Sequence, residues 1–161
     1  MLRLSGEVAD GSVLFVSAGL NYIRWASVRI EEGRVRGGSA DAHTHPITVF
    51  AINSVDEDGN AAWASVWARL VFCHQYGSNG LTDVYDVSHE LNALVKLGGY
   101  QAVLDGMPDR WVEDLTIAGT PEECAEEISA YYATVAMLPV ATDRMDEVVR
   151  LTANSVLPRL S

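Results

Sequence analysis

Two short apolar runs, each followed by a longer stretch with helical spacing, limit most strongly what this chain can fold into. The runs are Ser12–Ser17 and Ile47–Ile52, and both are almost continuously apolar instead of alternating with polar residues. A run of this kind suits a strand that is buried on both faces of a sheet. The order of strand, helix, strand and helix predicts an α/β fold built from parallel strands.

The helix after the first run is expected to begin with Asn21 as its N-cap residue. The glycines at positions 33, 37 and 38 are expected to end it. Its apolar positions recur at helical spacing, and they are Tyr22, Trp25, Val28 and Ile30. The segment 56–60 is expected to cap the next helix, residues 61–75, in which Trp63 and Trp67 are interpreted as core or interface residues.

The clearest helix start lies at Thr120. Thr120 is expected to be the N-cap, Pro121 the first helical residue, and Glu123 the partner that completes a capping box. A short strand-like run with Leu115 and Ile117 precedes this helix. The apolar run 135–140 after it is predicted to be the last strand, and a terminal helix is expected to begin at Asp143 with Met145, Val148, Val149 and Leu151 facing inward.

The segment 76–110 breaks the alternation of strands and helices. Residues 77–80 are expected to form a turn, and residues 88–97 an amphipathic helix. Gly98 and Gly99 should interrupt this helix before it resumes at residues 100–104. The chain of 161 residues, 48% of them hydrophobic, is therefore interpreted as a single domain, residues 1–161, with a helical insertion at about 76–110.

The charge of the chain excludes two classes of partner. The net charge is −11 and the only lysine is Lys96, so we expect no nucleic acid and no anionic membrane as a partner. No signal peptide and no apolar run long enough to span a bilayer is present in the sequence, which predicts a cytoplasmic protein. Cys124 is interpreted as a reduced core cysteine.

Three segments, in this order along the chain, resemble one known family. They are residues 4–15 (LSGEVADGSVLF), 47–60 (ITVFAINSVDEDGN) and 114–128 (DLTIAGTPEECAEEI). Together they resemble the luciferase-like monooxygenases, TIM-barrel oxidoreductases that depend on flavin or on the deazaflavin F420. The resemblance covers only the C-terminal part of the family's barrel. It implies a partial (β/α)8 TIM barrel with C-terminal βα units, in which the three predicted strands are barrel strands six, seven and eight.

Such a partial barrel would leave open sheet edges and an uncovered inner face. We therefore expect a homo-oligomer, or a complex with a chain that supplies the first barrel strands. If the chain is active as an enzyme, the family resemblance implies that its substrate is a small molecule.

The active site of a TIM barrel lies at the C-terminal ends of its strands. Ser17 and Asn53 lie at the C-terminal ends of the two predicted strands and are expected to bind the cofactor or substrate, or alternatively to cap strand ends and the following helices. The resemblance also places Arg3 near the cofactor phosphate, although Arg3 could equally be a surface residue. His74 and His89 flank the insertion that shapes the substrate pocket in the family, and an ordinary polar surface role is the alternative for both. His74 and Tyr76 are expected to line that pocket.

Other motifs give no self-contained catalytic site. The pair His43 and His45 lies in a loop without a third ligand nearby, so it is interpreted as structural or solvated and no metal is expected. No nucleophile elbow, Walker loop, dinucleotide fingerprint or zinc spacing is found in the sequence, and catalytic residues are not assigned.

The resemblance thus predicts the C-terminal segment of an oxidoreductase, either a monooxygenase or a hydride-transfer reductase. The resemblance implies that the cofactor is F420 or FMN, and the amino-acid sequence of residues 114–124 favours F420. The alternative is a non-catalytic remnant that acts only through oligomerisation or a partner chain. The missing Gly-rich phosphate turn of the family supports this alternative.

Overall fold

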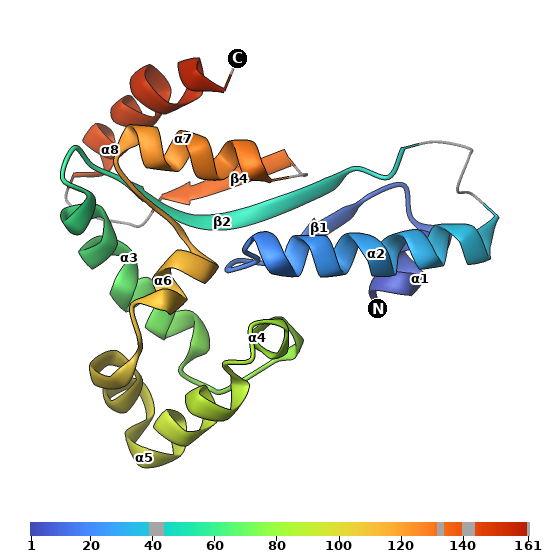
Figure 1. The fold of residues 1–161 in the computed structure, drawn as a ribbon, viewed down its shortest axis with the longest axis horizontal. Helices are drawn as coiled ribbons and strands as arrows, with labels where there is room; N and C mark the ends of the chain where they lie inside the picture. The colour runs from blue at the N-terminus through green and yellow to red at the C-terminus, as the bar shows by residue number, and fades with distance from the viewer. Residues whose placement is uncertain (39–43, 132–133, 140–143, 161) are drawn as a thin grey trace.

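The computed structural model describes residues 1–38, 44–131, 134–139 and 144–160 (Figure 1). Helices and strands alternate along the chain, with a group of helices between the second and third strands. In order, the elements are α1 (Leu2–Val8), β1 (Ser12–Leu14), α2 (Leu20–Gly37), β2 (Ile47–Val55), α3 (Gly59–His74), α4 (Gly80–Val84), α5 (Ser88–Gly106), α6 (Arg110–Leu115), β3 (Ile117–Gly119), α7 (Pro121–Ala130), β4 (Thr134–Pro139), α8 (Met145–Leu151), the π-helix η1 (Thr152–Val156) and the 3-10 helix η2 (Leu157–Arg159).

Strand β2 is the centre of a fully parallel sheet. Thr48 of β2 pairs with Val13 of β1 and with Thr134 of β4, so these two strands lie on opposite edges of β2. Further along β2, Asn53 pairs with Ile117 of β3 as well as with a residue of β4. Strands β1 and β3 therefore share one edge of β2, one after the other, and β4 occupies the other edge. The predicted α/β fold with parallel strands is confirmed.

The two faces of the sheet differ in exposure. Leu14, Val49 and Ala51 lie on one face and are buried in the hydrophobic core, which also includes residues of α2, α3 and α7. On the opposite face, Val13 is 66% exposed and Phe15 is 78% exposed. Since side chains alternate along a strand, the opposite face is open at the N-terminal half of the strands, whereas Ile52 further along β2 on that face is buried. This open face is the one expected of a partial barrel.

Helix α2 begins earlier and faces a different way than the sequence predicts. Its N-cap residue is Gly19, not Asn21, and it continues through Gly33 to Gly37. The buried residues are Ile23, Ala26, Ile30 and Gly33, whereas Trp25 and Val28 are exposed although they belong to the apolar positions found in the sequence. Trp25 instead stacks on Tyr22, with the ring centroids 5.6 Å apart, on the outer side of the helix. Gly33 lies on the buried side at the point where α1 approaches closely.

The contact between α1 and α2 depends on two glycines. A Cβ atom on Gly6 of α1 would lie 1.9 Å from the carbonyl oxygen of Ile30 in α2. A Cβ atom on Gly33 of α2 would lie 1.9 Å from the carbonyl oxygen of Arg3 in α1. Both distances are far below a van der Waals contact, so the two helix backbones touch where neither helix has a side chain.

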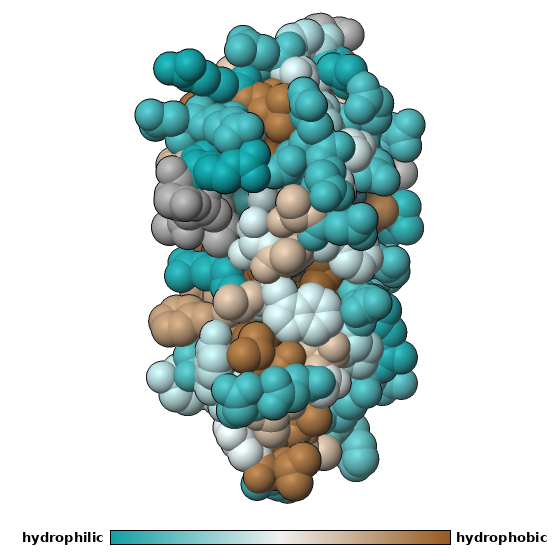
Figure 2. Space-filling view, turned by 90° about the vertical axis from the view of Figure 1, so that its left-hand side faces the viewer, coloured by the Kyte–Doolittle hydropathy of each residue, from teal (hydrophilic) through white to brown (hydrophobic). Residues whose placement is uncertain are grey.

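The insertion follows α3, and its helices α4 and α5 lie in the lower part of Figure 1. Gly98 and Gly99 have non-helical backbone angles inside α5, as the sequence predicts. The two tryptophans of α3 bind this helix to two other segments: the Trp63 indole donates to the Ala118 carbonyl (3.0 Å) and the Trp67 indole to that of Leu104 (3.1 Å). On this side of the molecule, hydrophobic residues form separate patches between hydrophilic ones (Figure 2).

The C-terminal part of the chain follows most of the predictions. The Thr120 hydroxyl accepts from the Glu123 backbone N–H, and the Glu123 carboxylate accepts from the Thr120 N–H at 2.8 Å, so the capping box is confirmed. Cys124 is free and buried. The predicted last strand is present as β4, although position 140 lies outside the described residues.

The terminal helix differs in part from its prediction. Asp143, its expected first residue, also lies outside the described residues, and α8 begins at Met145. Val148 is buried as expected, but the prediction for Val149 is wrong because Val149 is exposed. No helix of the described ranges is long and apolar enough to cross a membrane.

Candidate functional site

Ser17 lies three residues beyond β1, in the turn that leads into α2. Its φ of 68° is in the left-handed region, which costs a non-glycine residue about 1 kcal/mol or more. Its side chain is buried, and its hydroxyl has no hydrogen-bond partner among the described residues. Ser17 does not cap α2, because Gly19 holds that position. The backbone strain and the unused hydroxyl coincide at the C-terminal end of a barrel strand, where sites of this fold lie.

Asn53 lies near the C-terminal end of β2 and is completely buried. Neither its amide oxygen nor its amide nitrogen has a partner in the described part of the chain. It does not cap α3 either, because the Asp58 carboxylate accepts from the Asn60 N–H in that role. Alternation along β2 places Asn53 on the same face as Val49 and Ala51, beneath the helices. Asn53 thus lies at the predicted end of the sheet but on its covered face.

His74 is the last residue of α3 and is only 4% exposed. Both ring nitrogens lack a partner among the described residues. Burial lowers the pKa of His74 to about 4, so the imidazole is neutral at neutral pH.

His74 lies on the wall of a cavity of about 240 Å³. The cavity lies between the end of β1, the start of α2, the end of α3 and the start of α4. It therefore connects a C-terminal strand end to the insertion, and the role of His74 in a substrate pocket stays a prediction. The lining residues are Phe15, Val16, Tyr22, Cys73, His74, Asn79, Gly80 and Leu81.

The structure does not bring the other two predicted residues to this cavity. Tyr76 is 89% exposed and is not among the lining residues. Arg3 forms an ion pair with Glu32 at 2.5 Å, on the surface beside the C-terminal half of α2, whereas Ser17 precedes the N-terminus of that helix. The roles of Tyr76 and Arg3 stay predictions that this geometry does not favour.

Two titratable residues near the start of α2 were not singled out from the sequence. The Tyr85 hydroxyl accepts from the Tyr22 backbone N–H (3.2 Å), and burial raises the pKa of Tyr85 to about 12. Burial also raises the pKa of Glu127 in α7 to about 8. Both environments form only when the insertion and α7 pack against other elements, so no local pattern could have identified them.

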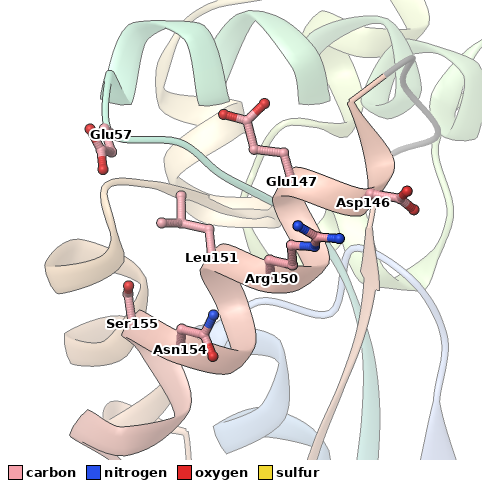
Figure 3. Close-up of a pocket in the computed structure, with 7 residues that line it drawn as sticks. All are labelled: Glu57, Asp146, Glu147, Arg150, Leu151, Asn154 and Ser155. Atoms are coloured by element: carbon pink, nitrogen blue, oxygen red, sulfur yellow. The ribbon is translucent and has the colours of Figure 1, made fainter.

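A larger hollow of about 530 Å³ lies between the β2–α3 loop and α8 (Figure 3). Glu57 faces it from the loop, and the other lining residues come from α8 and the following π-helix (Figure 3). Asp146 and Glu147 add two more carboxylates, and Arg150 is the single basic lining residue. This excess of negative charge does not suit a phosphate group.

Residues 1–137 match the sequence model of the family described as luciferase-like monooxygenase. The chain belongs to the luciferase-like monooxygenase family. Among solved structures, it is similar to the coenzyme F420-dependent tetrahydromethanopterin reductase from Methanopyrus kandleri, with a TM-score of 0.77 and 19% identity over 100% of this chain. It is also similar to a monooxygenase from Streptomyces bottropensis, with a TM-score of 0.58 and 15% identity over 99% of this chain.

A third similar structure is the oxygenating constituent of 3,6-diketocamphane monooxygenase from Pseudomonas putida in complex with FMN, with a TM-score of 0.50 and 15% identity over 99% of this chain. The matched regions make up 48%, 45% and 45% of the three solved chains. This chain therefore spans about half the length of the structures it matches. At these identities the likeness shows the fold, which is the C-terminal part of a TIM barrel.

Proposed function

We propose that this chain is the C-terminal half of an oxidoreductase that uses F420 or a flavin such as FMN. The observation that carries the proposal is Ser17, a buried residue with a strained backbone and an unpartnered hydroxyl at the C-terminal end of β1. Buried polar groups are normally hydrogen-bonded, so an unpartnered one at this place requires an explanation. A bound ring with polar edges would supply the missing partner. Membership of the family and the F420- and FMN-dependent neighbours support the choice of cofactor.

The residues of this chain fit such a cofactor in part. Ser17 can donate one hydrogen bond from its hydroxyl and accept others. Asn53 fits less well, because it lies on the covered face of the sheet. Arg3 does not fit as a phosphate ligand, because it is paired with Glu32 at the other end of α2.

A bound F420 or flavin would supply the hydride-transfer or oxygen chemistry, and the protein would supply orientation. Ser17 would fix the position of the ring through its hydroxyl. The buried surroundings of Ser17 would exclude water from that contact. His74 and the cavity behind Phe15 would receive part of the substrate.

The open face of the sheet supports a second part of the proposal. Val13 and Phe15 are mostly exposed and Phe50 is 36% exposed, although all three lie on a sheet face that a closed barrel would bury. The matched solved chains are about twice as long as this one. We infer that a polypeptide carrying the first barrel strands, or a second copy of this chain, covers this face.

The test is a fluorescence titration of the chain with FMN and, separately, with F420. Saturable micromolar binding is expected, and Ser17→Ala should weaken it by about tenfold because one hydrogen bond is lost. The matched control is Ser27→Ala, since the Ser27 hydroxyl only donates to the Ile23 carbonyl within α2. No binding of either cofactor to a folded sample would contradict the proposal.

The alternative function is a non-catalytic one, in which the chain acts only by association. The exposed apolar face of Val13, Phe15 and Phe50 favours this alternative independently of any cofactor. Light scattering after size exclusion should then find an oligomer, and Phe15→Ser with Phe50→Ser should yield monomers. A wild-type monomer with low dye binding and a cooperative melt would contradict association.

The cytoplasmic location stays a prediction.

A further inference from the structure

Helix α2 runs along the right-hand half of the molecule, beside α1 (Figure 1). The side of α2 that packs on the core carries the buried residues Ile23 and Ile30. On another side, Val28 and Val35 are each more than half exposed, and Trp25 is more than one third exposed. Surface helices normally place polar residues on their exposed side, so these three residues, the α2 stripe, form a surface suited to binding a partner.

The α2 stripe has the spacing of a coiled-coil seam. Together with Glu32, its residues follow one another by three, four and three positions, as the a and d positions of a heptad do. Glu32 brings no uncompensated charge into the stripe, because its carboxylate pairs with Arg3 at 2.5 Å and with Arg29 at 3.1 Å. The stripe can therefore pack against a second helix without leaving a carboxylate buried alone.

The charges beside the stripe favour a second copy of the same helix as the partner. Arg24 and Glu31 are exposed and lie seven positions apart, which places them on the same side of the stripe. When two α2 helices pack antiparallel about a two-fold axis, Arg24 of each copy faces Glu31 of the other, so this ion pair forms twice. In a parallel pair, Arg24 would instead face Arg29 of the other copy and be repelled. The charge pattern is thus complementary to itself in the antiparallel arrangement.

We propose that α2 binds a second copy of this chain through an antiparallel helix pair, in which Trp25 of each copy packs against Val28 of the other. The stripe points away from the core and from the sheet that α2 covers, so this contact leaves the open sheet face free. It does not depend on the oxidoreductase function or on completion of the barrel. A contact made by one helix of each copy is small, so the dissociation constant is expected to be on the order of 100 µM.

The experiment is sedimentation equilibrium of the full chain. All samples carry Phe15→Ser and Phe50→Ser, so that the open sheet face does not contribute to association. We expect dimers at about 500 µM and monomers at about 5 µM, where size exclusion is carried out. Trp25→Ala should weaken the dimer about tenfold, because it removes the central apolar contact.

Charge reversal tests the antiparallel register. Arg24→Glu or Glu31→Arg alone should weaken the dimer at least about tenfold, because like charges then meet twice. The double variant with both changes should regain the original affinity. A mixture of the two single variants should form heterodimers, because each charge then meets its opposite. The matched control is Arg36→Glu on the other side of the stripe, which should change the dissociation constant by less than about threefold.

Circular dichroism checks that each variant is folded. If a reversed variant fails to fold, Arg24→Gln and Glu31→Gln take its place, and each should weaken the dimer by about threefold. The proposal is overturned if the chain with an intact stripe is monomeric at about 1 mM. It is also overturned if the double variant associates as weakly as the single ones, as expected for charges that face only water.

Discussion

The contact between α1 and α2 gives a quantitative prediction for Gly33→Ala. An alanine Cβ at position 33 would lie 1.9 Å from the Arg3 carbonyl oxygen and 2.7 Å from its carbonyl carbon. Both partners are backbone atoms, so no side chain can rotate away, and α1 must shift by roughly 1.5 Å to restore a normal contact. That shift also breaks the reciprocal contact at Gly6. Overpacking of this kind costs about 1–3 kcal/mol or more, while alanine regains about 1 kcal/mol of helix propensity.

We therefore expect Gly33→Ala to lower the free energy of unfolding by about 2 kcal/mol, or Tm by about 4–8 °C for a domain of this size. Urea and thermal denaturation followed by circular dichroism measure both quantities. The matched control is Gly80→Ala, because a Cβ on Gly80 meets no atom within 4 Å. Gly80→Ala should be neutral or stabilising by about 0.4–1 kcal/mol. A Gly33→Ala protein as stable as the wild type would refute the reasoning, since it would mean that the helix backbones do not touch.

Three further predictions concern stability. Thr120→Ala should lower the free energy of unfolding by about 1 kcal/mol in urea titrations, and Thr120→Ser should recover most of it, because serine keeps the N-cap hydroxyl; equal losses for both variants would argue against the capping box. Trp63→Phe should cost about 1 kcal/mol or more through the lost hydrogen bond to the Ala118 carbonyl, and a measured loss near zero would contradict that bond. Since burial raises the folded-state pKa of Glu127 to about 8, above its ordinary value, Glu127 favours folding at low pH and loses this contribution as the pH rises through 8. Glu127→Gln should accordingly gain stability relative to the wild type between pH 5 and pH 9 in a series of melts, and a constant difference over this range would rule out a buried Glu127.

The sequence predicts best the elements whose causes are local. The capping box of Thr120 and Glu123 involves residues three positions apart, and the kink at Gly98 depends on glycine itself, so both could be located without tertiary information. The buried face of α2 could not, because it is decided by the approach of α1. The large apolar side chain of Trp25 suggested that its face of α2 is buried. The close contact between α1 and α2 instead places Gly33, on another face of α2, against α1.

The candidate site could be predicted only in its position along the chain. The rule that barrel sites lie at C-terminal strand ends located Ser17, and the insertion boundary located His74. The orientation of Asn53 beneath the helices depends on strand register, and the exposure of Tyr76 depends on where α3 ends. The burial of His74 arises when α4 and the end of β1 meet it, and residues so far apart in sequence give no periodic signal.

The central position of β2 has a consequence for how the chain folds. Strands β1, β3 and β4 each pair with β2, and each of these pairings joins residues far apart in sequence. Loop closure must therefore precede any stable sheet, which is typical of proteins that fold slowly. During synthesis, β2 acquires its second edge partner only after residues 134–139 have left the ribosome. Until then, one edge of a nine-residue strand is free to pair with other chains, so β4 protects this edge of the nascent protein from aggregation.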